Sequence, residues 1–158
     1  MKQTDNFKFD EANVMNELVY RNLSEDAKRQ ICAWKYGGEY DLYNLPSYEE
    51  MQVRQIGFMN PQRKKNYYGF WDKSILVGFV NILEEKEEVF IGIGVNPDLC
   101  NKHYGQRMLL ITYEISKKLY PDKPLYLEVR TWNIRAVKCY QKAGFRIDGQ
   151  AYELTTGI

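Results

Sequence analysis

Residues 89–130 read VFIGIGVNPDLCNKHYGQRMLLITYEISKKLYPDKPLYLEVR, and they contain the pattern of a strand, a helix and a second strand. The first strand is predicted over 89–95 and the second over 125–130. Between them, one stripe of residues recurs at helical spacing: Met108, Ile111, Thr112, Ile115 and Leu119. Two strands joined through one helix lie parallel, so this stretch predicts a parallel crossover within an α/β sheet.

The rest of the chain predicts further strands and helices around this crossover. The other predicted strands are 17–22, 67–71, 75–83 and 145–154, and the other predicted helices are 24–34, 47–57 and 133–143. Ser24 and Ser47 are the expected N-caps of the first two helices, and Gly144 is the expected C′ residue of the last. We therefore expect a single α/β domain over 14–158, with a mixed central β-sheet and helices on both faces. Residues 1–13 are polar and aperiodic, so we expect a flexible leader there.

Composition excludes several classes of function. A net charge of +1 gives no basic surface for nucleic acid or for an anionic membrane, and no apolar run approaches the length of a membrane span. Three cysteines without close pairing indicate a reducing compartment, so we expect a cytoplasmic protein. A single histidine and no CxxC motif argue against a metal site.

The loop between the first strand of the crossover and its helix is a candidate anion site. Ligands bind open sheets at the carboxyl ends of parallel strands, where the N–H groups of the next helix face outward. Gly105 would let that backbone approach a phosphate closely, and Lys102 and Arg107 add positive charge. The same features occur in an ordinary connection between a strand and a helix, so these residues leave both readings open.

Two glycines inside the strand 89–95 also have two explanations. Gly92 and Gly94 remove side chains from the middle of a strand that is expected to be buried. They either mark a place where a ligand or another backbone comes close, or relieve crowding against a neighbouring aromatic ring.

Three polar residues near the end of the chain are candidates for chemistry. Glu128 falls in the middle of a predicted interior strand, where it either forms an ion pair with Arg130 or acts as a general base whose pKa partial burial raises. Asn133 is placed to cap the last helix. Tyr140 shares a helix face with Asn133, and it is either a core residue or a proton donor at the carboxyl end of the sheet.

Together these residues resemble the GCN5-related N-acetyltransferases (GNAT) over roughly residues 67–154. The strongest match is LEVRTWNIRAVKCYQKAGF, which fits the run Asn-x-x-Ala-x-x-x-Tyr-x-x-x-Gly-Phe of the family at Asn133, Ala136, Tyr140, Gly144 and Phe145. With LEVR before it, this half is most similar to the ribosomal-protein N-terminal acetyltransferase branch. Val95, Pro97 and Gly105 match the diphosphate motif, but Cys100 stands at its Arg/Gln position and His103 at its first glycine.

The resemblance implies direct transfer of acetyl from acetyl-CoA to a primary amine, with Glu128 as base and Tyr140 as acid to the thiolate. It implies an oxyanion donor at the N–H of Val95 or a neighbour, on a splayed bulge of the strand. The residues that it implies for binding acetyl-CoA are Ile93, Gly94, Val95, Asn101, Lys102, His103, Gly105, Gln106, Asn133 and Tyr140. The residues that it implies for the acceptor wall are Trp34, Tyr36 and Tyr40, with Tyr43 beside them.

The acceptor and the assembly stay open at this point. A small molecule, a peptide and a protein N-terminus each offer the primary amine that the reaction needs, and a homodimer is also open. A non-catalytic acyl-CoA-binding or regulatory domain on the same fold is the alternative, since a fold does not determine function.

Overall fold

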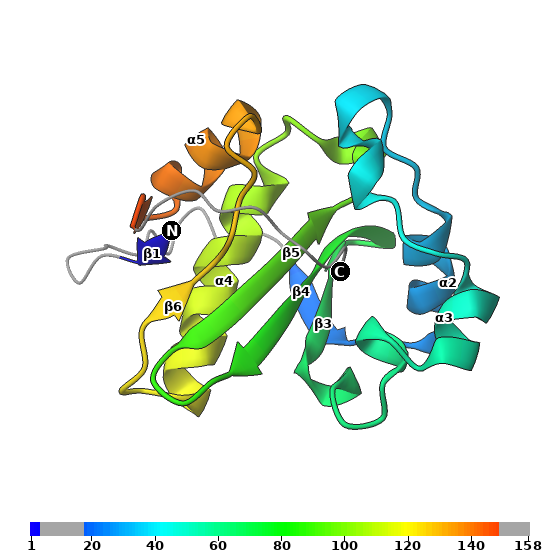
Figure 1. Ribbon diagram of the computed structural model, residues 1–158, viewed down its shortest axis with the longest axis horizontal. Helices are drawn as coiled ribbons and strands as arrows, with labels where there is room; N and C mark the ends of the chain where they lie inside the picture. The colour runs from blue at the N-terminus through cyan, green and yellow to red at the C-terminus, as the bar shows by residue number, and fades with distance from the viewer. Residues whose placement is uncertain (4–17, 149–158) are drawn as a thin grey trace.

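The computed structural model describes residues 1–3 and 18–148, which form one sheet with helices packed on it (Figure 1). In the described residues the sheet has seven strands in the order β2-β3-β4-β5-β6-β1-β7. The strands are β1 (Lys2–Gln3), β2 (Val19–Asn22), β3 (Tyr67–Asp72), β4 (Ile75–Glu84), β5 (Val89–Val95), β6 (Leu125–Tyr126) and β7 (Phe145–Arg146). Of the pairings in this sheet, β5 with β6 is parallel and the others are antiparallel. The predicted mixed sheet and parallel crossover are confirmed.

Four α-helices and four short 3-10 helices complete the described part of the chain. The α-helices are α2 (Glu25–Ala33), α3 (Tyr48–Arg54), α4 (Tyr104–Leu119) and α5 (Ile134–Lys142). The 3-10 helices are η1 (Gly38–Tyr43), η2 (Gly57–Met59), η3 (Lys64–Asn66) and η4 (Pro97–Leu99). The expected caps form, because the hydroxyls of Ser24 and Ser47 accept from the N–H groups of Ala27 and Glu50. Gly144 has φ 97°, a conformation that suits glycine after a helix.

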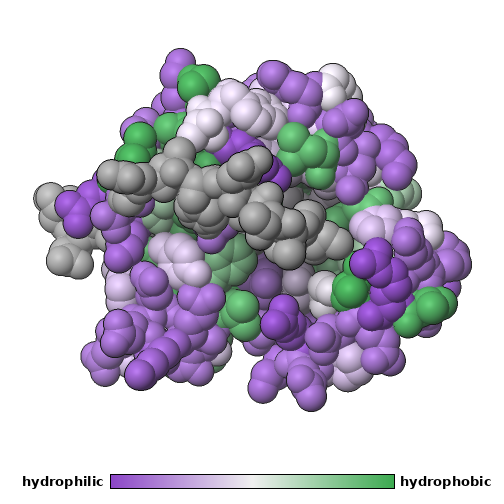
Figure 2. Space-filling model, viewed as in Figure 1, coloured by the Kyte–Doolittle hydropathy of each residue, from purple (hydrophilic) through white to green (hydrophobic). Residues whose placement is uncertain are grey.

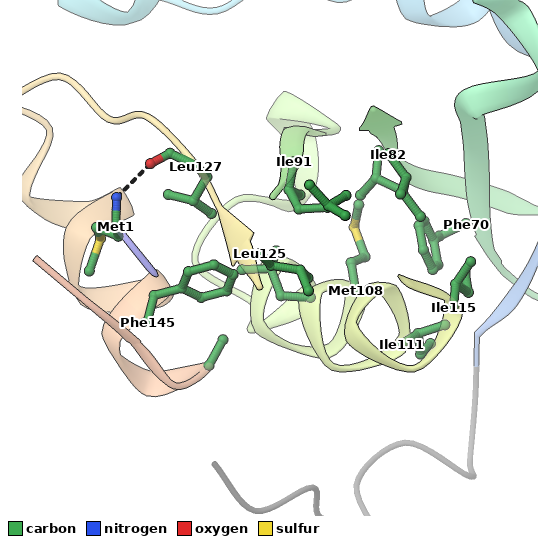
Figure 3. Close-up of a cluster of buried hydrophobic side chains, with 14 of the residues drawn as sticks. Met1, Phe70, Ile82, Ile91, Met108, Ile111, Ile115, Leu125, Leu127 and Phe145 are labelled. Carbon is green, nitrogen blue, oxygen red and sulfur yellow. Dashed lines mark hydrogen bonds between the residues drawn. The ribbon is translucent and has the colours of Figure 1, made fainter. Parts of the chain in front are cut away.

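The larger of the two hydrophobic cores lies between the sheet and α4 (Figure 3). Met108 of α4 is 0% exposed and lies beneath Gly78 of β4. A Cβ on Gly78 would come within 2.6 Å of the Met108 sulfur, so the glycine lets the helix approach the sheet. The other labelled residues of this core come from both layers: Met1, Phe70, Ile82, Ile91, Ile111, Ile115, Leu125, Leu127 and Phe145.

The second core lies on the opposite face of the sheet, under α2 and α3. Strand alternation separates the two, because Phe79 of β4 packs in the second core while Val80 and Ile82 pack in the first. The fully or nearly buried members of the second core are Ala27, Ile31, Cys32, Tyr48, Met51, Phe58, Trp71 and Leu76. Helices therefore cover both faces, as predicted, and hydrophilic side chains dominate the outer rim of the molecule (Figure 2).

Several predicted boundaries need correction. The predicted strand 125–130 forms a ladder only over Leu125–Tyr126, because β5 does not accompany it further. The predicted strand 145–154 begins at β7, while residues 149–154 lie outside the described residues. Most of the predicted leader also lies outside them, but Lys2–Gln3 is a strand between β6 and β7, so residues 1–3 do not form a loose leader.

The described helices include none that combines the length and the apolar character needed to cross a membrane. The longest of them, α4, has 16 residues.

The two glycines of β5 have different structural needs. Gly94 pairs with Phe79 of β4, and a Cβ on Gly94 would lie 2.9 Å from Cζ of that ring and closer still to Cε1. The nearest atoms to a Cβ on Gly92 are 3.6 Å away, which is ordinary contact. Crowding against an aromatic ring therefore explains Gly94 but not Gly92.

Alanine at these two positions should separate the explanations. Gly94→Ala is expected to lower the free energy of unfolding by about 1–3 kcal/mol, since Phe79 is held among other rings and has little room to move. Gly92→Ala is the matched control and should stay within about 0.5 kcal/mol of the parent. Urea unfolding measures both, and equal losses at the two positions would contradict this account.

Candidate active site

The parallel ladder between β5 and β6 is unusually short. It contains two pairs, Val89 with Leu125 and Phe90 with Tyr126. Beyond them no strand in the described residues pairs with this side of β5. The register of β5 with β4 is continuous over its whole length, so the expected bulge is absent, and the register shift in this region lies between β3 and β4. After these two pairs the strands part, so the edge of β5 beyond Phe90 has no strand paired with it in the described residues, and we call this unpaired edge the gap.

Alternation along β5 decides which backbone groups face this gap. The N–H of Asn96 donates to the carbonyl of Val77 on the β4 side, at 2.8 Å. The N–H groups of successive strand residues point to opposite edges of the strand. Val95 and Ile93 precede Asn96 by one and three residues, so their N–H groups face the gap. The N–H of Gly94, by the same rule, faces β4. Ile93 and Val95 thus direct their N–H groups to the gap, and their contact with acetyl-CoA stays a prediction, whereas Gly94 serves the packing of the strand.

Tyr36 reaches the same gap from the segment before η1. Its hydroxyl donates to the carbonyl of Val95 at 2.6 Å, and its N–H donates to the Oδ1 of Asn44 at 2.6 Å. Burial raises the pKa of the Tyr36 hydroxyl well above its ordinary value, so the hydroxyl stays protonated. Tyr36 therefore connects the predicted acceptor wall to the end of β5.

Aromatic rings from residues 36–43 and from the residue before the N-cap of α5 form a continuous group, which we call the aromatic wall: Tyr36, Tyr40, Tyr43 and Trp132. The ring centre of Trp132 lies 5.6 Å from that of Tyr40 and 6.3 Å from that of Tyr43. Tyr43 lies 6.4 Å from Tyr36. Trp132 was not predicted as a site residue, although its place directly before the N-cap of a helix was a usable signal.

Trp34 does not belong to this wall. Its ring packs against Phe79, 6.3 Å between centres, within the second core. Trp34 is therefore a packing residue of the second core, whereas Tyr36 and Tyr40 lie in the aromatic wall, where their contact with an acceptor stays a prediction.

Asn133 holds the wall in place. Its Oδ1 accepts from the N–H of Ala136 at 3.1 Å, which caps α5, and its Nδ2 donates to the hydroxyl of Tyr43 at 3.0 Å. The residue is 6% exposed. The capping prediction is confirmed, and the side-chain amide of Asn133 is already engaged at both ends.

The loop before α4 has an unusual backbone. Asn101 and His103 have φ of 67° and 66°, the left-handed region that favours glycine. His103 is the N-cap of α4, yet its side chain makes no capping hydrogen bond. The N–H groups of Tyr104, Gly105 and Gln106 therefore have no hydrogen-bond acceptor among the described residues. Asn101, Lys102 and His103 are exposed around them.

Gly105 and Gln106 also join the two helices at this end of the sheet. A Cβ on Gly105 would lie 3.1 Å from the Sγ of Cys139 in α5, so glycine allows this close approach. Gln106 donates from Nε2 to the carbonyl of Lys142 at 3.5 Å. Burial raises the pKa of the Cys139 thiol to about 11. Gly105 thus has a packing role whether or not an anion binds.

Tyr140 lies on α5 between the first core and the aromatic wall. Burial, with smaller contributions from Cys139 and Tyr43, raises the pKa of its hydroxyl well above the ordinary value. That hydroxyl has no hydrogen-bond partner within residues 1–3 and 18–148. A protonated phenol without a partner is available as a donor.

Glu128 differs from its prediction. It is exposed in the irregular segment after β6, and it forms no ion pair with Arg130. The alternation of this segment is as expected, since Leu125 and Leu127 are buried, but the strand is too short to bury Glu128. The partial burial that the sequence predicted for Glu128 is therefore absent. Among the described residues no group of three or more His, Cys, Asp or Glu could hold a metal ion.

Comparison with known proteins identifies the family. The model of the Acetyltransferase (GNAT) family matches residues 29–145. A comparison with curated proteins gives no match. A solved chimera of the spermidine N-acetyltransferase SpeG from Vibrio cholerae and hSSAT is similar, with a TM-score of 0.71 and 20% identity over 85% of this chain and 83% of that one.

Two further solved structures share the fold. An acetyltransferase (GNAT family) from Bacillus anthracis has a TM-score of 0.67 and 18% identity, over 94% of this chain and 86% of that one. Spermidine N-acetyltransferase from Vibrio cholerae, in complex with CoA and spermine, has a TM-score of 0.66 and 19% identity, over 84% and 83%. The match of the family model to most of the domain shows that the chain belongs to the Acetyltransferase (GNAT) family of acyl-CoA-dependent N-acyltransferases.

Proposed function

We propose that this protein transfers the acetyl group of acetyl-CoA to a primary amine by direct attack. The observation that carries the proposal is the gap beside β5, where the N–H groups of Ile93 and Val95 have no partner strand. The aromatic wall lies at the end of this gap, and the start of α4 follows Val95 by one loop.

The residues around the gap fit the acyl donor in two places. The amides of a pantetheine arm can pair with this edge as an added strand would, because Ile93 directs its N–H and C=O to that side and Val95 directs its N–H, while the carbonyl of Val95 accepts from Tyr36. The start of α4 suits a diphosphate, since its first N–H groups have no acceptor among the described residues and the dipole is positive there. Lys102, Asn101 and His103 would surround that diphosphate.

Transfer to an amine needs a donor for the oxyanion, an acid for the thiolate and a base for the amine, and we assign the first two to the N–H groups of the gap and to Tyr140. The nitrogen attacks the thioester carbonyl carbon, a C–N bond forms, and the C–S bond breaks. The N–H of Ile93 or Val95 stabilises the oxyanion of the tetrahedral intermediate. Tyr140 donates its phenolic proton to the departing thiolate, a role that suits a hydroxyl kept protonated by burial.

The third requirement is removal of a proton from the amine, which is protonated at neutral pH. Glu128 is our candidate base, and because it is exposed it would accept this proton through a water molecule. Two features support this assignment: Glu128 lies two residues after the end of β6, and the LEVR segment resembles protein N-terminal acetyltransferases.

Candidate acceptors of the acetyl group include polyamines and protein N-termini. Related folds include spermidine N-acetyltransferases, while the LEVR segment resembles the ribosomal-protein branch. A homodimer and a cytoplasmic location also stay predictions.

Thiol release from acetyl-CoA over a panel of small amines, polyamines and peptide N-termini tests the function. If CoA stabilises the protein against thermal unfolding but no amine is turned over, the proposed function is wrong.

The phenol of Tyr140 should matter for the rate and little for binding. Tyr140→Phe is expected to lower kcat about a hundredfold, because the thiolate loses its acid, while the Kd for CoA changes less than about threefold. Steady-state kinetics and calorimetry measure the two quantities. Tyr20→Phe, on the exposed edge strand β2, is the matched control. If kcat and CoA affinity fall together, Tyr140 is structural.

The backbone at His103 should tolerate glycine better than a branched residue. His103→Gly is expected to keep the free energy of unfolding within about 1 kcal/mol, whereas His103→Val should lower it by about 1–3 kcal/mol at φ 66°. The control is Lys102→Val, next to it and outside the left-handed region. Since the histidine side chain is exposed, CoA affinity of the glycine variant should match the parent, and a tenfold gain would show instead that the side chain obstructs the cradle.

A further inference from the structure

Arg135 is a cation with no carboxylate partner in the described part of the chain. It is the second residue of α5, and its guanidinium carbon lies 4.2 Å from the ring centre of Tyr40. None of the ion pairs among the described residues includes it, although the side chain is only partly exposed. Glu39 and Asp41 of η1 are exposed and do not pair with it. Its charge is therefore free to meet a ligand.

The position of Arg135 on its helix adds to this imbalance. The first turn of an α-helix carries the positive end of the dipole, which favours acidic residues and disfavours cations. The first turn of α5 contains no acidic residue. Arg135 thus reinforces a positive potential that nothing in this turn offsets, which is an arrangement typical of anion binding.

The surroundings of Arg135 place that potential beside the gap. Its charge acts on the hydroxyl of Tyr36 and on the thiol of Cys100, and at both it opposes the rise in pKa that burial causes. The Tyr36 hydroxyl is the group that bonds the carbonyl of Val95. Arg135 therefore lies near the acyl-transfer end of β5 as well as near the loop before α4.

An exposed aromatic ring lies next to the ring on which the same cation stacks. Trp132 is 37% exposed and contacts Tyr40, and the guanidinium of Arg135 lies over the ring of Tyr40. Leu42 and Ile134, the sequence neighbours of the wall, are also exposed, at 44% and 55%. A ligand that reached Arg135 would meet the rings of Tyr40 and Trp132 next to the charge.

We propose that Arg135, with the rings of Tyr40 and Trp132, binds a carboxylate on an acceptor amine that also carries an aromatic or large apolar group. A guanidinium stacked on a ring keeps the N–H donors at its edge, and these match a planar carboxylate. A polyamine would instead bring like charge to Arg135. The inference rests on the proposed function, and a phosphate of CoA is the other source of an anion here.

Matched amines test this subsite. Tryptophan and tryptamine differ in the carboxylate, and spermidine supplies a polycation. The parent should prefer tryptophan to tryptamine by about tenfold in kcat/KM. Arg135→Gln should lower the value for tryptophan about tenfold and leave tryptamine within twofold, with Arg135→Lys between them. Lys138→Gln, an exposed position three residues later on α5, is the control and should keep the preference.

Three results would overturn the inference. The first is a parent that uses tryptamine or spermidine as well as tryptophan, which would leave the proposed function standing. The second is an Arg135→Gln variant that binds CoA about tenfold more weakly and treats both amines alike, which would assign Arg135 to a cofactor phosphate. If no amine is turned over, the proposed function fails, and the subsite is then tested by calorimetry of tryptophan binding to the CoA-loaded protein. Binding by the parent that is lost in Arg135→Gln supports the subsite. The third overturning result is that the parent does not bind tryptophan.

Discussion

The site depends on where β5 and β6 stop pairing. Two parallel pairs hold the strands together at their start, and after Phe90 and Tyr126 they separate. Each further pair would have closed the edge of β5 with ordinary sheet hydrogen bonds, and no backbone donor would then have faced a ligand. The separation leaves Ile93 and Val95 at the end of a strand that β4 still holds rigidly along its other edge.

Close helix packing places the remaining groups around this edge. Gly78 lets Met108 of α4 approach the sheet, and Gly105 lets Cys139 of α5 approach α4. The start of α5 consequently lies near η1, where Asn133 bonds Tyr43. The aromatic wall is thus anchored to a helix cap at one end and to β5 through Tyr36 at the other.

Much of the fold could be predicted from local chemistry, because caps and apolar periodicity act within a few residues. Alternation in LYLEVR correctly separated buried Leu125 and Leu127 from Glu128, but it could not reveal that the partner strand leaves. Strand pairing depends on both segments, so the sequence of one strand does not predict where the pairing ends. Likewise, Gly92 and Gly94 look alike in sequence, and the cross-strand ring of Phe79 distinguishes them. Trp132 gave no periodic signal at all.

The hydrogen bond from Tyr36 bears on how the end of β5 would act. A strand edge normally offers a donor and an acceptor at each residue that faces outward. At Val95 the acceptor is already engaged by the Tyr36 hydroxyl, so the residue presents its N–H to the gap. A group that developed negative charge there would meet a donor, and the carbonyl that would otherwise repel it is satisfied by a protonated phenol. Because Tyr36 belongs to the segment that leads into η1, the aromatic wall and the proposed oxyanion donor are parts of one hydrogen-bonded unit.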